Sequence, residues 1–200
     1  KYKNNVPASL KTFIKNLKEI DYDIQLGKAV SKGKTVLGYY FQTKNDGLKK
    51  PGLTPFPSGL IHIAPNMVNY SDLALIPSYR AIVNIEPVAM AQSEGFFNIS
   101  SDAAGTIRKA PLLMTLDGIP YPSLSLETFR IGMNISDITI HCSSKVIQPK
   151  TAILGITIGD RSIPTDEQGQ ITINHRGPAN TFEYISAIDV LEEKNLEILK

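Results

Sequence analysis

Residues 23–41 read DIQLGKAVSKGKTVLGYYF, and this stretch indicates the fold class. Its first part, 23–32, carries apolar residues at helical spacing, and Gly33 is a residue that commonly ends helices. The following segment, Thr35–Phe41, is short, apolar and aromatic, as buried strands are. A helix, a glycine and a buried strand in succession are typical of an α/β domain.

The same kinds of pattern predict the elements around this unit. A first helix is expected from Ser9, with Leu10, Phe13, Ile14 and Leu17 apolar, and a second from Pro87 to Gly95. A third should follow Ser123, with Leu126, Phe129 and Met133 on its apolar face. A fourth should begin at Ser186, where a capping box with Asp189 is expected. Strands are expected at 60–64, 137–142 and 152–158, and 65–80 should be irregular. One β-hairpin should pair 96–99 with 106–116 across the turn 101–105, and a second should pair Arg161–Ile163 with Gln170–His175 across 166–169. We therefore expect a mixed α/β fold, with a central mixed sheet, flanking helices and two β-hairpins, and residues 1–200 should form one domain.

Composition excludes several classes of function. The chain has 21 basic and 19 acidic residues, a net charge of +2 and no basic stripe, so we expect no nucleic-acid partner. It contains no glycine-rich phosphate loop, no Gly-x-Ser-x-Gly elbow and no Cys/His spacing of the zinc type. We therefore predict no cofactor, no metal site and no catalytic residue. Cys142 is the only cysteine and should be a buried, inert thiol.

The histidines and two arginines remain as candidates for function. His62 and His141 alternate with apolar residues, which favours a structural role, whereas His175 follows a strand end, where functional residues concentrate. Arg108 and Arg176 lie in or just after predicted strands, where each should be partly buried and contact a carboxylate or a carbonyl oxygen. A structural ion pair and a contact with an anionic ligand both fit these arginines.

Three aspartates, Asp102, Asp117 and Asp166, lie in predicted turns. Aspartate stabilises turns by accepting hydrogen bonds from its own backbone, so we read all three as turn formers. Gly105 and Gly169 close two of these turns, and both should have positive φ.

Two segments together resemble the CHASE type-2 domain, an extracellular sensory domain. The first is GFFNISSDAAGTIRKAPLL at 95–113, followed by DGIPYPSL at 117–124, and the second is IPTDEQGQITINHRGP at 163–178. The family shows a similar glycine-aromatic-asparagine run, a Tyr-Pro-Ser-Leu helix start and a closing Arg-Gly-Pro corner. The resemblance covers roughly residues 23–200.

The resemblance implies the extracytoplasmic sensor domain of a bacterial membrane-anchored receptor, with a kinase, cyclase or similar effector inside the cell. It implies a small-molecule signal of unknown identity as the partner. The candidate ligand-binding residues are Arg108, Tyr121, His175 and Arg176, which all lie within these two segments. Ala104 replaces a second turn aspartate that the family often has, which argues against a metal there.

The family's first units, with a Trp-Pro-Trp motif, and its last strand have no counterpart here, so we expect an incomplete piece of such a domain. The strand Thr35–Phe41 should then be an exposed edge, which would favour a homodimer. Two other classes of function stay open: a small extracytoplasmic hydrolase that uses turn carboxylates or His175, and a structural or interaction domain.

Overall fold

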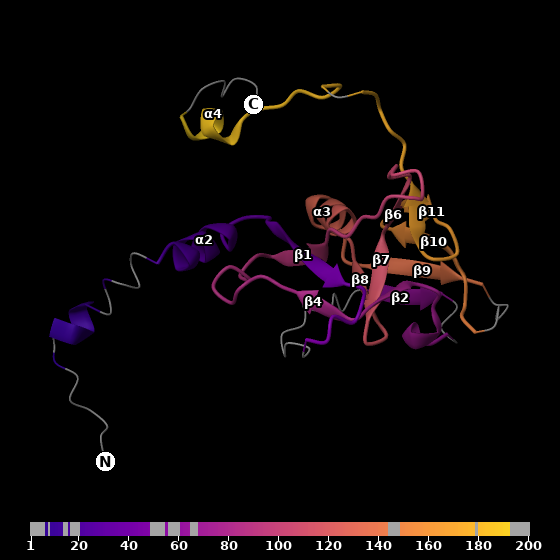
Figure 1. The fold of residues 1–200 in the computed structure, drawn as a ribbon, viewed down its shortest axis with the longest axis horizontal. Helices are drawn as coiled ribbons and strands as arrows, with labels where there is room; N and C mark the ends of the chain where they lie inside the picture. Colours follow the sequence, from indigo (N-terminus) through magenta and orange to yellow (C-terminus); the bar gives the residue numbers. More distant parts are fainter. Residues whose placement is uncertain are drawn as a thin grey trace, which may run out of the picture.

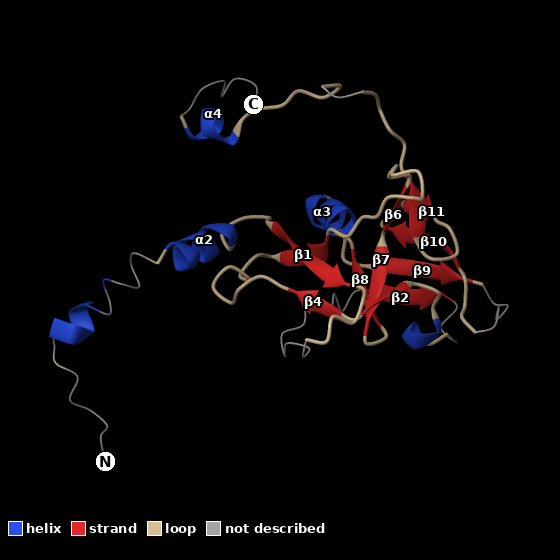
Figure 2. Cartoon of the chain, in the orientation of Figure 1, coloured by secondary structure: helices blue, strands red, loops and turns tan. Residues whose placement is uncertain are grey.

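Short strands outnumber helices in the computed structural model, which describes residues 7, 9–13, 16, 21–48, 55, 61–64, 68–143, 149–178 and 180–192 (Figures 1 and 2). The helices are α2 (Tyr22–Val30), α3 (Leu124–Gly132), α4 (Ala187–Leu191) and the short 3-10 helix η1 (Tyr70–Asp72). The strands are β1 (Val36–Gln42), β2 (Ile61–Ala64), β3 (Ile76–Ser78), β4 (Arg80–Ile82), β5 (Ser93–Phe96), β6 (Lys109–Pro111), β7 (Leu113–Leu116), β8 (Ile119–Pro122), β9 (Ile138–Cys142), β10 (Ile153–Ile158), β11 (Arg161–Pro164) and β12 (Gln170–Thr172). The mixed α/β class is thus confirmed. Within these ranges, no helix combines the length and the hydropathy that a bilayer crossing requires.

The helices predicted at 23–32 and after Ser123 are confirmed, and side chains cap both. The Asp21 carboxylate accepts two backbone N–H groups of the first turn of α2, and Ser123 Oγ accepts the N–H of Leu126 at 3.3 Å. The helix α4 follows Ser186 as predicted, but the Ser186 side chain makes no capping bond, so the expected capping box is wrong. Residues 9–13 and 16 of the first predicted helix are helical, whereas Ile14 and Leu17 lie outside the described residues.

The helix predicted from Pro87 to Gly95 is wrong. The N–H groups of Val88 and Ala89 both bond to the carbonyl of Ile85, which closes one turn. The chain then extends into β5 because that segment pairs with β1. Pairing with a distant strand therefore overrides the local preference for a helix. The segment 65–80 is also more regular than expected, since it contains η1 and β3 and reaches the start of β4.

The strands of the described residues form four small sheets. Their strand orders are β4-β1-β5, β11-β10-β9-β2, β12-β6 and β3-β7-β8. The first, second and fourth are mixed, because β1–β5, β9–β2 and β3–β7 pair in parallel. Tight hairpins join β7 to β8 across Asp117-Gly118 and β10 to β11 across Gly159-Asp160.

In both predicted hairpins, the two strands that were expected to pair with each other pair with other strands instead. The turns at 101–105 and 166–169 exist, but the strands that flank each turn do not pair with each other. β5 pairs with β1, β11 pairs with β10, and β12 pairs with β6. A turn motif predicts where the chain reverses, whereas the partner of each strand is decided by burial of its apolar face.

The expected exposed edge at Thr35–Phe41 is also wrong, because β1 lies in the middle of its sheet. β5 pairs with residues 36–39 and β4 with residues 40–42. Asn98 extends the pairing on the β5 side, since its carboxamide accepts the Phe41 N–H at 2.8 Å and donates to the Phe41 carbonyl at 2.7 Å. Asn84 donates to the Gly38 carbonyl at 3.2 Å on the opposite side. Side-chain amides thus replace main-chain partners where a neighbouring strand stops.

Two apolar clusters form the core. One lies under the four-stranded sheet and consists mainly of isoleucines and leucines, including Ile138, Ile140, Ile156 and Ile158 at 0% exposure. The other is aromatic and joins β1, β5, β7 and β8, with members Tyr39, Phe41, Ala81, Phe96, Met114, Leu116 and Tyr121. The ring of Phe41 lies 5.6 Å from that of Phe96 and 5.7 Å from that of Tyr121.

Helix α3 packs directly against the paired glycines Gly38 and Gly95 of β1 and β5. A Cβ atom on Gly95 would lie 2.5 Å from the Leu124 Cα and 2.6 Å from the Leu124 nitrogen. Because both of these are backbone atoms, the helix could not keep its position above any other residue. Gly95 therefore sets how closely α3 approaches the sheet, whereas a Cβ atom on Gly38 would first meet the Phe97 ring, at 2.8 Å.

A buried ion pair ties α3 to its surroundings. Glu127 is 0% exposed and Arg130 is 7% exposed. The Glu127 carboxylate accepts from Arg130 Nη2 at 2.5 Å, from Arg130 Nε at 2.9 Å and from the Ser93 hydroxyl at the start of β5. Arg130 Nη1 donates to the carbonyls of Ile135 and Ser136, at 2.9 and 3.2 Å. The hydrogen bond to Glu127 raises the pKa of Arg130 above its ordinary value.

Replacement of one partner should be far more harmful than replacement of both. Glu127→Ala leaves the Arg130 charge buried and unpaired, and we expect it to lower the free energy of unfolding by about 3–5 kcal/mol. The double variant Glu127→Leu, Arg130→Met buries no charge and should recover most of that loss. Urea denaturation of the two variants measures this, and equal stability of the single and double variants would contradict it.

Candidate functional site

Two turns of the same geometry lie far apart in the sequence, at Asp102-Ala-Ala-Gly105 and Asp166-Glu-Gln-Gly169. In each, the aspartate N–H donates to the carbonyl four residues further on at 2.9 Å. The aspartate Oδ1 accepts the N–H groups two and four residues further on, at 2.9–3.0 Å. The φ angles of Gly105 and Gly169 are 75° and 74°, which confirms both predictions. The reading of these two aspartates as turn formers is confirmed as well.

The second oxygen of each aspartate binds a basic residue, and the two basic residues are neighbours in the chain. Asp102 Oδ2 pairs with Arg108, and Asp166 Oδ2 pairs with Lys109 Nζ at 2.8 Å. The prediction that Arg108 contacts a carboxylate is therefore confirmed. The prediction that it is partly buried is wrong, since 59% of its side chain is exposed. Asp102 holds it at the surface because the whole turn lies there.

Asp166 carries more contacts than a turn alone requires. Burial by itself opposes ionisation of this carboxyl, but the hydrogen bond from Lys109 and the N–H groups of Gln170 and Gln168 outweigh it. Together they hold the pKa of Asp166 below its ordinary value. The Gln170 side-chain amide also donates to Asp166 Oδ2 at 3.3 Å. The carboxylate is thus charged and fixed at neutral pH.

The candidates His175 and Arg176 lie just beyond β12. His175 Nε2 bonds to the Ile107 carbonyl at 3.0 Å, so that nitrogen carries the proton. The Ile173 N–H also donates to the Arg108 carbonyl, at 2.9 Å, and these two bonds place His175 beside the start of β6. Arg176 is exposed and has no hydrogen bond or ion pair to any other residue that the structure describes. The predicted partner of Arg176 is therefore wrong, because the chain leaves the body at this point.

Tyr121 lies apart from the other candidates. It is 3% exposed in the aromatic core cluster, and desolvation by burial raises the pKa of its hydroxyl. The structure therefore brings Arg108 and His175 together, places Arg176 next to them, and puts Tyr121 in a different sheet.

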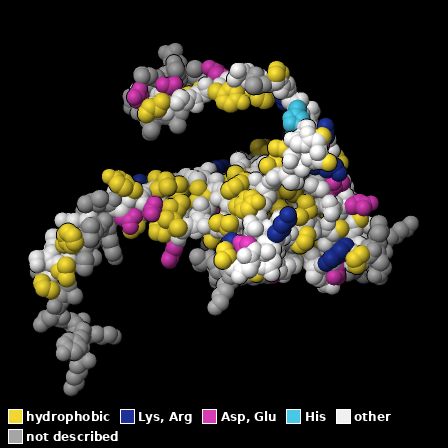
Figure 3. All heavy atoms as spheres, in the orientation of Figure 1, with side chains coloured by type: hydrophobic (Ala, Val, Ile, Leu, Met, Phe, Trp, Pro, Cys, Tyr) yellow, Lys and Arg dark blue, Asp and Glu magenta, His cyan; other side chains and the backbone are white. Residues whose placement is uncertain are grey.

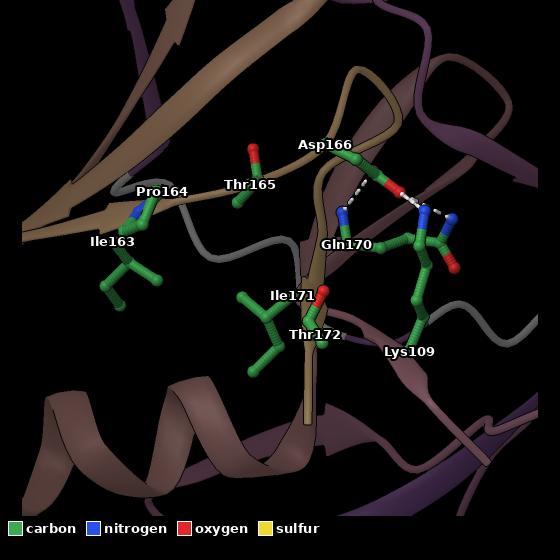
Figure 4. A pocket seen from close by; sticks show the side chains of 8 residues that line it. All are labelled: Lys109, Ile163, Pro164, Thr165, Asp166, Gln170, Ile171 and Thr172. Carbon is green, nitrogen blue, oxygen red and sulfur yellow. Dashed lines mark hydrogen bonds and ion pairs between the residues drawn. The ribbon is translucent and has the colours of Figure 1, made fainter. Parts of the chain in front are cut away.

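A hollow of about 550 Å³ opens where β11 and β12 separate (Figure 4). Ile163 and Ile171 form its apolar part and also pack against the core. Its polar part comes from three elements and consists of Lys109, Thr165, Asp166, Gln170 and Thr172. Figure 4 shows Lys109 and Gln170 converging on Asp166, while the Thr165 hydroxyl points away from Ile171. An apolar surface beside a few fixed polar groups is the usual composition of a small-molecule site.

The described side chains offer little catalytic chemistry. His141 Nε2 lies 2.7 Å from the Thr157 hydroxyl, and such pairs can activate a nucleophile, but neither residue lines the hollow. His62 is exposed on β2. Cys142 is 4% exposed and burial raises the pKa of its thiol, in agreement with an inert cysteine. No group of three metal-ligating side chains occurs in the described part of the chain.

The sequence reasoning missed Lys109 and the role of Asp166 in the hollow. One signal could have found them, which is the recurrence of an Asp-x-x-Gly turn at 102 and 166 beside the adjacent pair Arg108-Lys109. That recurrence predicts two similar carboxylates, but not that the adjacent residues Arg108 and Lys109 would each pair with one of them.

The comparisons with known proteins give one result. The model of the CHASE2 domain matches residues 5–200, which extends the resemblance noted above towards the amino terminus. No curated protein and no solved structure matches the chain.

The ionised Asp166 should contribute to the free energy of unfolding, and this contribution should disappear at low pH. Because its pKa is lowered in the folded state, this contribution is present above the ordinary aspartate pKa of about 4 and is lost as the pH falls through the folded value. Asp166→Asn should therefore be less stable than the parent at pH 7, by about 0.5–1 kcal/mol for the exposed ion pair. The difference should shrink below about pH 4.

Urea denaturation at pH 7, 5, 4 and 3 measures this difference. Asp160→Asn is the matched control, because Asp160 is 89% exposed and the charge change is the same. The control should stay within about 0.5 kcal/mol of the parent at every pH. A constant deficit of Asp166→Asn down to pH 3 would contradict the assignment.

Proposed function

Because the chain belongs to the CHASE2 domain family, we propose that it is the ligand-sensing domain of a bacterial membrane-anchored receptor, placed outside the cytoplasm. CHASE2 is a family of sensory domains, and this membership is the main support for the proposal. The effector inside the cell would be a histidine kinase, a nucleotide cyclase or a similar enzyme. The segment itself acts by binding rather than by catalysis.

The hollow between β11 and β12 is the proposed ligand site, and one observation carries this assignment. Two isoleucines form an apolar wall directly beside a fixed ion pair, Lys109–Asp166, in an opening large enough for a metabolite. The ligand class that fits combines an apolar part with an anionic or polar head. The head would bond to Lys109 and the Gln170 amide, and the apolar part would cover Ile163 and Ile171.

Two other functions fit less well. A hydrolase needs a base within reach of a nucleophile in a cleft, whereas the ring nitrogen that His175 presents to its neighbours already donates to the Ile107 carbonyl. A purely structural domain has no need of a hollow with a fixed ion pair. The contact of His141 with the Thr157 hydroxyl lies outside the hollow and so gives a hydrolase no substrate site there.

The ligand site predicts a residue-specific loss of binding. A panel of small carboxylates, amino acids and sugar acids is screened for a rise in the melting temperature of the 200-residue chain. For each compound that raises it, Lys109→Met should weaken binding about tenfold or more, because one charge-assisted hydrogen bond is lost. Calorimetric titration measures the affinity.

Lys28→Met on α2 is the control, since it makes the same charge change on a different element. The fold should survive both substitutions because Lys109 is 54% exposed and the Asp166 turn keeps its backbone bonds. If every stabilising compound binds Lys109→Met as tightly as the parent, the hollow is not the site.

The proposed location outside the cytoplasm predicts labelling from outside the cell. Leu154 is 60% exposed, so a cysteine at that position is accessible, whereas the native Cys142 is 4% exposed. In intact cells that make the whole receptor, a membrane-impermeant maleimide should label Leu154→Cys more strongly than the parent protein. Labelling only after lysis would place the domain inside the cell.

A further inference from the structure

Among the described residues, the outer face of the sheet β4-β1-β5 is only partly covered. Helix α3 packs on Gly95, and the Phe97 ring lies over Gly38. Tyr40, Phe97 and Ile82 are nevertheless 39%, 54% and 48% exposed. Tyr40 pairs directly with Ile82 across the strands, and its ring lies 6.0 Å from that of Phe97. We call these three side chains the bare face. Contiguous exposed aromatic and aliphatic groups of this kind mark interaction surfaces.

A second hollow adjoins the bare face at the point where β5 ends. It measures about 270 Å³ and has Tyr40, Asn98, Ile99 and Met114 in its lining. At this point the Asn98 carboxamide, rather than a continuing strand, lies beside Phe41. An opening of this size accepts one aromatic side chain, which is the usual anchor of a protein interface.

The same chain carries an apolar segment that leaves the body. The described residues 176–178 and 180–192, which we call the arm, run away from the strands after β12 and end at α4 (Figure 1). Phe182, Tyr184, Ile188 and Val190 are 65%, 77%, 55% and 39% exposed. Figure 3 shows hydrophobic side chains in yellow along this arm.

We propose that two copies of the chain exchange arms, so that the arm of each copy packs on the bare face of the other. Each molecule presents both halves of the contact, so one twofold axis satisfies both arms and closes the assembly. The arm is held away from its own sheet, which leaves it available to a second copy (Figure 1). Phe182 or Tyr184 of one copy fills the hollow beside Tyr40 and Asn98 of the other.

The area is adequate for a stable dimer. Aromatic side chains bury about 150–250 Å² each when fully covered. The exposed parts of the four arm residues and the three bare-face residues, counted on both copies, come to about 1,000–1,500 Å² in total. Specific interfaces bury about 1,200–2,000 Å², so the exchange reaches the lower part of that range. This dimer uses the face of β1 and not its edge, and it does not depend on the ligand site.

Sedimentation velocity over a range of concentrations tests the proposal on the 200-residue chain. The parent should change from a monomer of 21.9 kDa to a species of twice that mass as concentration rises. Phe182→Ser, Tyr184→Ser in the arm and Phe97→Ser on the bare face should each raise the dimer dissociation constant at least tenfold. Leu154→Ser is the control, because Leu154 is 60% exposed on β10 and belongs to neither surface. Circular dichroism checks that every variant is folded.

Disulfide trapping distinguishes exchange from packing within one chain. A Tyr184→Cys variant mixed with a Phe97→Cys variant should give a covalent dimer on oxidation, whereas the buried Cys142 stays outside the reaction. Three results would overturn the proposal: a monomer at all concentrations, a dimer that neither the arm nor the face substitutions weaken, or a chain carrying both cysteines that links only within itself.

Discussion

The buried pair of Glu127 and Arg130 is the interaction on which the arrangement of this domain depends. Its hydrogen bonds reach the start of β5 through Ser93 and the connection before β9 through two carbonyls. Removal from water costs both charges several kcal/mol, so the pair persists only because its neighbours supply the bonds that water would have made. The ion pair and its three hydrogen-bond partners, Ser93, Ile135 and Ser136, therefore hold both the position of α3 on β5 and the segment that leads into β9.

The sequence predicted the features that depend on neighbouring residues. The helix after Ser123, the strands at 137–142 and 152–158, and the positive φ of Gly105 and Gly169 were all correct, because caps, alternation and turn chemistry act within a few positions. Strand partners were wrong, because the partner of β5 lies about sixty residues earlier, in β1. The apolar face assigned to α3 was only partly right, since Phe129 and Met133 are exposed while Glu127 is buried.

In the candidate site, too, the features set by neighbouring residues were predicted and those set by distant strands were not. The sequence identified Arg108 as a residue that contacts a carboxylate. Its partner, Asp102, is a turn residue only six positions away, so a local pattern can predict the contact. The hollow was not foreseeable, because it lies between strands that were expected to pair and instead belong to different sheets. Tyr121 matched a family motif, yet its hydroxyl belongs to the aromatic core. The motif therefore identified the family, but it did not show which of its residues pack in the core and which lie on the surface.

The carboxamide of Asn98 has a practical consequence for producing the protein. Asn98-Ile99-Ser100 is an acceptor triplet for N-linked glycans in eukaryotic secretory cells. A glycan on that nitrogen would sit where Nδ2 donates to the Phe41 carbonyl, within the narrow space at the end of β5. If the glycan is added during synthesis, before the chain folds, the Asn98 carboxamide could not pair with Phe41 at the end of β1. Bacterial expression, or a host that lacks this glycosylation, preserves the contact.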